Sequence, residues 1–434
     1  MISQILFALI LGAAVFLFTS NIKKVIRNIR LGRELDRSDR PTDRWKMMAR
    51  VALGQSKMVI KPVAAILHIF VYVGFVIINI EVVEILIDGL LGTHRVFSFV
   101  GPLYNVLIGS FEVLGLLVLL SCVIFLVRRN VIKLRRFTMR ELTSWPRTDA
   151  NLILITEILL MSAFLIMNGA DYELQGRGIS HYVQAGAFPV SSAFSGFFAG
   201  MSDSALELME RGCWWFHLVG MLAFLNYLPY SKHLHILLAF PNTYYSNLDR
   251  KGKLSDMENV AREVKLTMDP STVLPEPSSS MPQKFGARDV HDLTWKQLMD
   301  AYSCTECGRC TSECPANQTG KLLSPRKVMM DTRDRLEEVG KGLDKNGADF
   351  KDEKSLFSYI VEEELWACTS CNACVNACPV NIDPLSIIID MRRYLVMEES
   401  KIPSELAGMF TRIENNGAPW QFAQADRLKW TENN

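Results

Sequence analysis

Cys304-Thr-Glu-Cys307-Gly-Arg-Cys310-Thr-Ser-Glu-Cys314-Pro315 is the stretch that decides the fold of this chain, and a second copy follows it. The copy is Cys368-Thr-Ser-Cys371-Asn-Ala-Cys374-Val-Asn-Ala-Cys378-Pro379. In such C-x2-C-x2-C-x3-C-P motifs, three close thiolates bind one cubane, and the fourth reaches the cubane of the other motif. The spacing therefore predicts two [4Fe–4S] clusters. One is bound by Cys304, Cys307, Cys310 and Cys378, and the other by Cys368, Cys371, Cys374 and Cys314.

Zinc is the competing interpretation of paired cysteines, but a four-ligand zinc site does not explain a triple spacing that ends in proline twice. Fifty-three residues separate the motifs. This spacer is longer than in small ferredoxins and shows helical periodicity near Ser324–Leu336 and Glu353–Leu365. We therefore expect an α-helical dicluster ferredoxin domain over residues 291–400. The other cysteines, Cys122 and Cys213, lie in or beside apolar segments, which favours a reducing compartment over a disulfide framework.

Apolar residues concentrate before residue 240, in blocks near the roughly 20 residues that a membrane-spanning helix needs. The first block is not preceded by basic residues and shows no cleavage site, so we interpret it as a retained anchor rather than a signal peptide. The fold expected is mainly α, with a five-span transmembrane bundle over residues 1–240. The predicted spans are about Ile2–Thr19, Pro62–Leu90, Val100–Val127, Asn151–Ala170 and Cys213–Leu238.

Loop charges predict the orientation, because Lys and Arg collect on the cytoplasmic side. Asn21–Lys61 has twelve Lys/Arg against four acids, and Arg128–Arg147 has seven against one, so both loops are expected inside. Ala170–Gly212 has two basic residues against five acids, so it is expected outside together with the N-terminus. The iron–sulfur domain is then cytoplasmic. A net charge of +1 gives no support for a nucleic-acid partner.

Histidines inside spans are rare and mark functional sites, although some are only hydrogen-bonded core residues. Two imidazoles at matched depth can bind a haem iron from both sides. His68 and His235 lie at the inner ends of the second and fifth spans, and we predict that they bind one haem b. His233 is a weaker candidate because it points nearly opposite to His235 on a continuous helix. His217 lies near the outer end and, at five whole turns from His235, would share its face.

Membrane carboxylates are candidates for proton handling. Glu112 and Glu157 lie in apolar sequence within the third and fourth spans, and with His217 they are candidates for handling protons or quinone. The alternative for both glutamates is a protonated, hydrogen-bonded structural role. Glu81 and Glu84 lie near the outer interface, where they could simply be solvated.

The run Phe216-His-Leu-Val-Gly-Met followed by Leu228-Pro-Tyr-Ser-Lys-His-Leu-His235 resembles the last span of the cytochrome b (gamma) subunit of respiratory nitrate reductases. Members of that family bind two haems between the second and fifth spans. Leu67-His-Ile-Phe-Val-Tyr-Val-Gly-Phe matches around the first ligand, but Ile78 stands where the second is expected. The resemblance therefore implies one inner haem, with a second only if His94 or His181 completes a site with His217.

Sequence stretches on either side of the cysteine motifs extend the resemblance over nearly the whole chain. Phe285–Tyr302, Leu365-Trp-Ala, Asp390–Val396 and Asn415–Trp420 resemble heterodisulfide-reductase-related membrane Fe–S oxidoreductases. Some of these are proposed to link electron-transfer flavoprotein to menaquinone in bacterial inner membranes. Relatives often continue into a cysteine-rich CCG domain, so a separate CCG-domain subunit is the implied partner, and electron-transfer flavoprotein is a further candidate. Residues 401–434 are the expected docking tail; the alternative for Asn416–Trp420 is an ordinary turn.

Residues 241–290 are expected to be a linker with one amphipathic helix near Leu254–Met268 and a breaker-rich stretch from Asp269. The order of sites predicts an electron-transfer subunit of a quinone-linked oxidoreductase, working between a cytoplasmic flavin or thiol partner and (mena)quinone. The alternatives are a membrane scaffold or sensor with structural clusters, and a subunit of an ion-translocating redox pump. The residues do not state the direction of electron flow.

Overall fold

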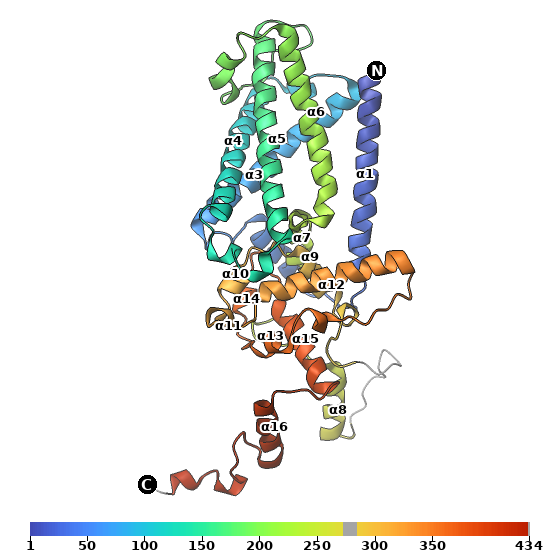
Figure 1. Ribbon diagram of the computed structural model, residues 1–434, viewed down its shortest axis with the longest axis vertical. Coiled ribbons are helices and arrows are strands. Elements are labelled where there is room, and N and C mark those ends of the chain that lie inside the picture. The colour runs from blue at the N-terminus through green and yellow to red at the C-terminus, as the bar shows by residue number, and fades with distance from the viewer. Residues whose placement is uncertain (272–283, 433–434) are drawn as a thin grey trace.

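The computed structural model describes residues 1–271 and 284–432, which are mainly helical (69%) and contain no β-strand. Long helices stand side by side in one half of the molecule, and short helices gather below them (Figure 1). The N-terminus lies at the end of the long-helix half that is far from the short helices (Figure 1). The mainly α fold predicted from sequence is confirmed.

Within the described residues, four helices are long and apolar enough to cross a membrane. Three of them carry a proline in the first turn, where the missing N–H leaves no helical hydrogen bond unmade. Their mutual faces form a core around residues such as Tyr104, Phe111 and Phe164. The four are α1 (Ile2–Ile29), α3 (Pro62–Leu91), α4 (Pro102–Asn130) and α5 (Trp145–Gly176).

The fifth predicted span differs from the structure. Its helix, α6 (Asp203–Tyr227), lies beside α5 (Figure 1), but it starts ten residues earlier than expected and ends eleven residues sooner. The first nine residues of α6 include Asp203, Glu207, Glu210 and Arg211, and such charges are costly inside a bilayer. The predicted bounds Cys213–Leu238 are therefore wrong, and α6 is not among the four apolar helices.

The chain breaks after Tyr227 because Pro229 cannot continue an α-helix. Two 3-10 turns, η6 (Leu228–Tyr230) and η7 (Lys232–Leu234), lead into α7 (His235–Tyr244). The carboxylate of Asp149 holds the break: it accepts hydrogen bonds from Ser231 Oγ at 2.7 Å and from the Lys232 amide at 3.1 Å. The expectation that His217 and His235 share one face of a continuous helix is therefore wrong.

The remaining helices form the lower half and its connections. They are α2 (Pro41–Met48) with the π-helical turn η1 (Ala49–Leu53), α8 (Glu258–Met268), α9 (Trp295–Ser303), α10 (Arg309–Ser312), α11 (Pro315–Gln318), α12 (Pro325–Asn346), α13 (Glu362–Trp366), α14 (Ala373–Ala377), α15 (Pro384–Met397) and α16 (Ser404–Asn416). Further 3-10 turns are η2 (Val96–Val100), η3 (Arg135–Phe137), η4 (Arg140–Leu142), η5 (Ser191–Phe197), η8 (Val290–Asp292), η9 (Leu356–Ser358), η10 (Gln424–Asp426) and η11 (Lys429–Thr431).

Two sequence predictions in this half need correction. The helix expected at Glu353–Leu365 is only η9 and the five-residue α13, because side chains of Ser355 and Glu364 cap separate short turns. The predicted linker 241–290 is too long at both ends. Asn242 is buried and donates to the carbonyl of Val380 at 2.9 Å, and the amide of Ala287 donates to Asp390 O at 2.9 Å. Most of the breaker-rich stretch lies outside the described residues.

The two halves are joined where α12 crosses the lower end of α1 (Figure 1). Arg27 on α1 pairs with Asp344 and donates to the carbonyl of Gly340 at 2.9 Å. The neighbouring Asn28 donates to the hydroxyl of Tyr302 at 3.0 Å. Because Asn28 is buried, this bond satisfies a group that would otherwise weaken the junction.

Immediately after α1, Gly32 passes so close to the lower half that a Cβ would lie 2.6 Å from the Trp295 nitrogen. We expect Gly32→Ala to force these backbones apart and to destabilise the protein by about 1–3 kcal/mol, as overpacking does. The measurement is thermal unfolding in detergent. Gly12→Ala is the matched control in α1, because nothing lies within 4 Å of its added Cβ. Equal melting temperatures for both variants would contradict this account of the junction.

Candidate redox site

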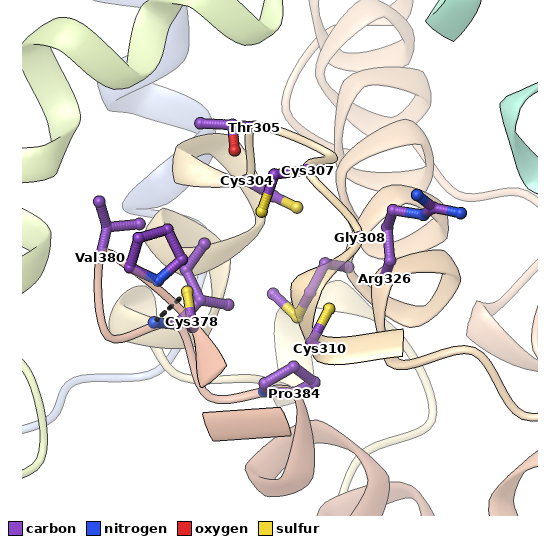
Figure 2. A pocket seen from close by; sticks show the side chains of 12 residues that line it. Cys304, Thr305, Cys307, Gly308, Cys310, Arg326, Cys378, Val380 and Pro384 are labelled. Carbon is purple, nitrogen blue, oxygen red and sulfur yellow. Dashed lines mark hydrogen bonds between the residues drawn. The ribbon is translucent and has the colours of Figure 1, made fainter. Parts of the chain in front are cut away.

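The first three cysteines of the first motif and the last cysteine of the second share one hollow, which Figure 2 shows. Its empty space is about 370 Å³, counting the part open to solvent. Left-handed backbone at Glu306 and Gly308 curls the loop, and Gly308 also leaves room for Arg326, whose Nη1 would clash with an added Cβ. The cysteines that line this hollow are Cys304, Cys307, Cys310 and Cys378.

The second hollow has about 310 Å³ of empty space on the same measure. Its loop repeats the first: Ser370 and Asn372, which correspond to Glu306 and Gly308, also have positive φ. The cysteines that line it are Cys314, Cys368, Cys371 and Cys374. The structure thus brings together the same two sets of four that the motif spacing predicts, including the exchange of the fourth cysteine. That these residues are the cluster ligands stays a prediction.

Burial sets the protonation state of the thiols in both hollows. It raises the pKa of Cys304 to about 11 and the pKa of Cys374 and Cys378 to about 12, so bare thiols stay protonated at neutral pH. Bound iron would therefore have to displace these protons. Backbone amides already point at two sulfurs, from Ile382 to Cys378 at 3.3 Å and from Ser370 to Cys368 at 3.4 Å. In the described part of the chain, no three His, Cys, Asp or Glu are grouped to hold one metal ion.

Three of the predicted histidines lie close enough together for their charges to interact. His68 is in the second turn of α3, and the rings of His233 and His235 stack with centroids 5.5 Å apart. His68 and His233 each have a buried Nδ1 without a hydrogen-bond partner, whereas His235 Nδ1 lies 3.1 Å from the carbonyl of Lys232. That bond orients the His235 ring and leaves its Nε2 for another partner. The structure therefore brings His68 near both His233 and His235.

The loop of the first hollow contacts the histidine segment directly. Glu306, between Cys304 and Cys307, pairs with Lys232, next to His233, and with Arg333 on α12 at 2.9 Å. Burial alone would raise the pKa of Glu306, but the charges of Lys232 and Arg333 outweigh it and hold the pKa below its usual value. Sequence reasoning did not single out these residues, although Glu306 is an acid that the second motif lacks.

The outer histidines do not form a second pair. His217 Nδ1 lies 3.0 Å from the carbonyl of Leu160, while His94 Nε2 faces Asp171 at 3.4 Å. Leu160 and Asp171 are eleven residues apart on α5, which is about 16 Å along a helix. His94 Nδ1 also accepts the Val183 amide, and the His181 ring lies beside that of His94, with centroids 5.7 Å apart and planes tilted by 48°. The structure therefore does not bring His217 together with His94 or His181.

Among the predicted membrane carboxylates, Glu112 accepts hydrogen bonds on both carboxylate oxygens. It accepts the amides of Val190 and Ser191 at 2.9 and 3.1 Å and the Asn168 side chain at 3.2 Å, which favours the structural alternative. Glu157 makes no hydrogen bond or ion pair that the described residues show, and its proton-handling role stays a prediction.

Glu81 and Glu84 are buried, so the expectation that they are solvated is wrong. Glu84 accepts from Tyr104 at 2.8 Å, and Tyr104 also contacts the buried Arg95–Asp171 pair. The signal that the sequence offered for this network was Arg95, a lone cation in a short turn between two apolar spans.

Comparisons with known proteins agree with the cluster site. Residues 303–382 match the family model described as a 4Fe–4S dicluster domain. This match supports the predicted [4Fe–4S] clusters. No solved structure is similar to the chain.

The chain is 28% identical to the probable iron–sulfur-binding oxidoreductase FadF of Bacillus subtilis over 99% of its own length and 61% of the relative's. It is 26% identical to the EtfAB:quinone oxidoreductase of Syntrophomonas wolfei, over 92% of this chain and 55% of that protein. A shorter match, 31% identical, covers 24% of this chain and 52% of a CoB–CoM heterodisulfide reductase subunit from Methanosarcina acetivorans. The chain thus spans less than two thirds of its first two relatives. These similarities support an iron–sulfur oxidoreductase subunit with an electron-transfer role.

The exchange of cysteines gives a sharp test. We expect Cys378→Ala to remove the cluster of the first motif, and so about half of the iron and sulfide per chain, because its fourth ligand comes from the second motif. The measurement is iron and sulfide analysis with electron paramagnetic resonance (EPR) of the reduced protein. Cys122→Ala, buried in α4 away from both hollows, is the control. If Cys378→Ala and Cys368→Ala abolish the same signal, the ligand exchange is wrong.

Proposed function

We propose that this chain is the electron-transfer subunit of a membrane quinone-linked oxidoreductase. Electrons pass between a cytoplasmic flavin or thiol partner and (mena)quinone through two [4Fe–4S] clusters and one haem b. The observation that carries this proposal is the contact between the first cluster loop and the histidine segment, made by Glu306 and Lys232. That contact supports a path between the predicted iron–sulfur site and the histidines of the membrane half.

The residues present fit a haem b with His68 and His235 as ligands. Histidine ligands in metal sites usually bind iron through one ring nitrogen and hold the other by a hydrogen bond, as His235 Nδ1 does with Lys232 O. The buried, unpartnered Nδ1 of His68 marks a polar group whose partner is not supplied by the described chain. His233 remains the weaker choice because its Nδ1 lacks the backbone hydrogen bond that orients His235. Bound haem supplies one-electron chemistry, and the protein orients and insulates it.

The orientation proposed is an inner-membrane protein with its N-terminus outside and its iron–sulfur domain in the cytoplasm. Both basic loops lie against the cluster half: Lys57 donates to Cys378 O at 3.1 Å, and Arg326 donates to Arg136 O at 2.7 Å. Since basic loops stay on the cytoplasmic side, this contact supports a cytoplasmic cluster domain. We propose α6 as the fifth span, with its charged first turns at the outer surface.

The C-terminal residues offer a docking surface for a partner. α16 contains no buried residue, and the segment after it exposes more than half of Trp420, Phe422, Leu428 and Trp430. Aromatic residues of this kind are enriched where proteins bind one another. One relative is named for EtfAB and another for a heterodisulfide reductase. We therefore propose a flavoprotein such as electron-transfer flavoprotein, or a CCG-domain subunit, as the partner of residues 401–434.

The haem assignment predicts the effect of single histidine changes. We expect purified protein to contain about one haem per chain, and His68→Ala and His235→Ala each to lower that content severely, because one axial ligand is lost. The measurement is a pyridine haemochrome assay beside iron and sulfide analysis. His217→Ala is the control, since its ring bonds the carbonyl of Leu160 in the middle of α5.

Unchanged haem content in both His68→Ala and His235→Ala would show that the ligand assignment is wrong. A content near two haems per chain, lowered by His217→Ala, would restore an outer site.

The electron-transfer role predicts a redox response of the isolated chain. After chemical reduction, addition of a soluble naphthoquinone should reoxidise the haem and both clusters, and His68→Ala should slow reoxidation of the clusters. The measurement is stopped-flow absorbance followed by freeze-quench EPR. Full cofactor content without any response to quinone would instead favour a scaffold or sensor with structural clusters.

A further inference from the structure

Arg309 is a buried cation inside the first cluster loop, between Gly308 and the cluster residue Cys310. Its side chain is 6% exposed. Nη1 donates to the carbonyl of Lys57 at 2.9 Å, and Nη2 lies 3.4 Å from the sulfur of Met58. In the part of the chain that the structure describes, no carboxylate lies within ion-pair distance of its guanidinium. A buried charge without a partner is costly, so this guanidinium needs a compensating negative charge.

The neighbouring buried cations are compensated in an ordinary way. Arg326 pairs with Glu141 at 2.7 Å, while Lys232 and Arg333 share Glu306. Lys57 resembles Arg309 instead: it is half-buried, donates to the carbonyl of Cys378 at 3.1 Å, and forms no ion pair that the described residues show. Arg309 and Lys57 therefore flank the first hollow, on the side that faces the membrane helices, without an ion pair in the described residues. Arg136, which interacts with Cys307, also forms no such pair but stacks on Phe137.

The negative charge that fits these cations is the cluster itself. Four thiolates around a [4Fe–4S] core carry a net negative charge, and reduction adds one more. A nearby fixed cation favours the reduced form and raises the midpoint potential, since charge and hydrogen bonding around the sulfurs set that potential. The positions of Arg309 and Lys57 therefore fit a first hollow that holds an anionic cluster better than a hollow lined only by neutral thiols.

The second motif has no counterpart of Arg309. Asn372 and Ala373 stand where the first motif has Gly308 and Arg309. The second hollow has one cation comparable to Lys57, Arg392, which donates to the carbonyls of Leu365 at 3.0 Å and of Cys368 and stacks on Trp366 at 5.1 Å. Cys371 is exposed, whereas none of the other seven cluster cysteines is. The repeat therefore places an exposed cluster away from the membrane half and a cation-flanked cluster against it.

Arg309 is also placed to act on the histidine site. The backbone that it holds, Lys57–Met58, leads into α3, whose second turn carries His68. The charge of Arg309 acts on the His68 ring. One side chain is therefore electrostatically linked both to the first hollow and to a proposed haem ligand.

We propose that Arg309 and Lys57 raise the reduction potential of the cluster held by Cys304, Cys307, Cys310 and Cys378 above that of the other cluster, so that electrons flow toward the membrane. One electron leaves the exposed, reduced cluster and enters the membrane-side cluster, and no bond or proton changes place. The inference rests on the proposed electron-transfer function and adds a direction to it.

The test is an anaerobic redox titration of the full chain in detergent, followed by EPR. Arg309→Gln should lower the midpoint potential of one cluster signal by about 59 mV. For a one-electron reduction this is about a tenfold change in the equilibrium constant. Lys57→Gln should lower the same signal, Arg309→Lys should retain most of the wild-type value, and Arg392→Gln should move the other signal. Lys341→Gln, a highly exposed site on α12, is the matched control.

Three results would overturn the proposal. The first is unchanged midpoint potentials in Arg309→Gln and Lys57→Gln with full iron and sulfide, and the second is that these two variants shift the same signal as Arg392→Gln. The third is a wild-type protein in which the signal shifted by Arg309→Gln has a lower midpoint potential than the other signal. If Arg309→Gln loses its cluster, Lys57→Gln decides the outcome alone.

The haem provides a second readout that separates this proposal from the proposed function. Where haem is present, Arg309→Gln should lower its midpoint and Arg392→Gln should not, because only Arg309 acts on His68. A chain that binds no haem would remove the haem step of the proposed function, while the cluster titration would still decide the role of the two cations.

Discussion

The buried ion cluster of Lys232, Glu306 and Arg333 is the interaction on which the rest of the structure depends. Lys232 belongs to the segment after the break at Pro229, Glu306 to the first cluster loop, and Arg333 to α12. Each charge is almost fully removed from water, and removal of one partner would leave another uncompensated. The cluster half is therefore held in one position against the membrane half rather than tethered loosely to it.

The same constraint explains why the chain abandons a regular helix after Tyr227. A continuous helix would carry Lys232 and His235 along the membrane axis and away from the cluster loop. The proline break, held by Asp149 through Ser231 Oγ and the Lys232 amide, turns the segment so that Lys232 meets Glu306. It also stacks His233 against His235, which a straight helix would place on nearly opposite faces.

The two cysteine motifs are alike in loop conformation and unlike in surroundings. Both use left-handed backbone at matching positions, so each loop can wrap three sulfurs around one hollow, which the last cysteine of the other motif completes. The first is enclosed by Arg309, Arg326 and the membrane-side loop, whereas the second leaves Cys371 exposed. An internal repeat with unequal surroundings is what a directed chain of redox centres requires, since potentials follow the environment of each centre.

Local spacing in the sequence was sufficient for the cysteine sets, because cluster geometry imposes short, rigid intervals that few other structures share. The four apolar spans were equally accessible, since hydropathy over about 20 residues is a local property. Only the tertiary structure decided the bounds of α6, the proximity of His68 to both His233 and His235, and the burial of Glu81 and Glu84. Each of these depends on contacts between residues far apart in sequence, such as Asp149 with Ser231 and Lys57 with Cys378, which no periodicity encodes.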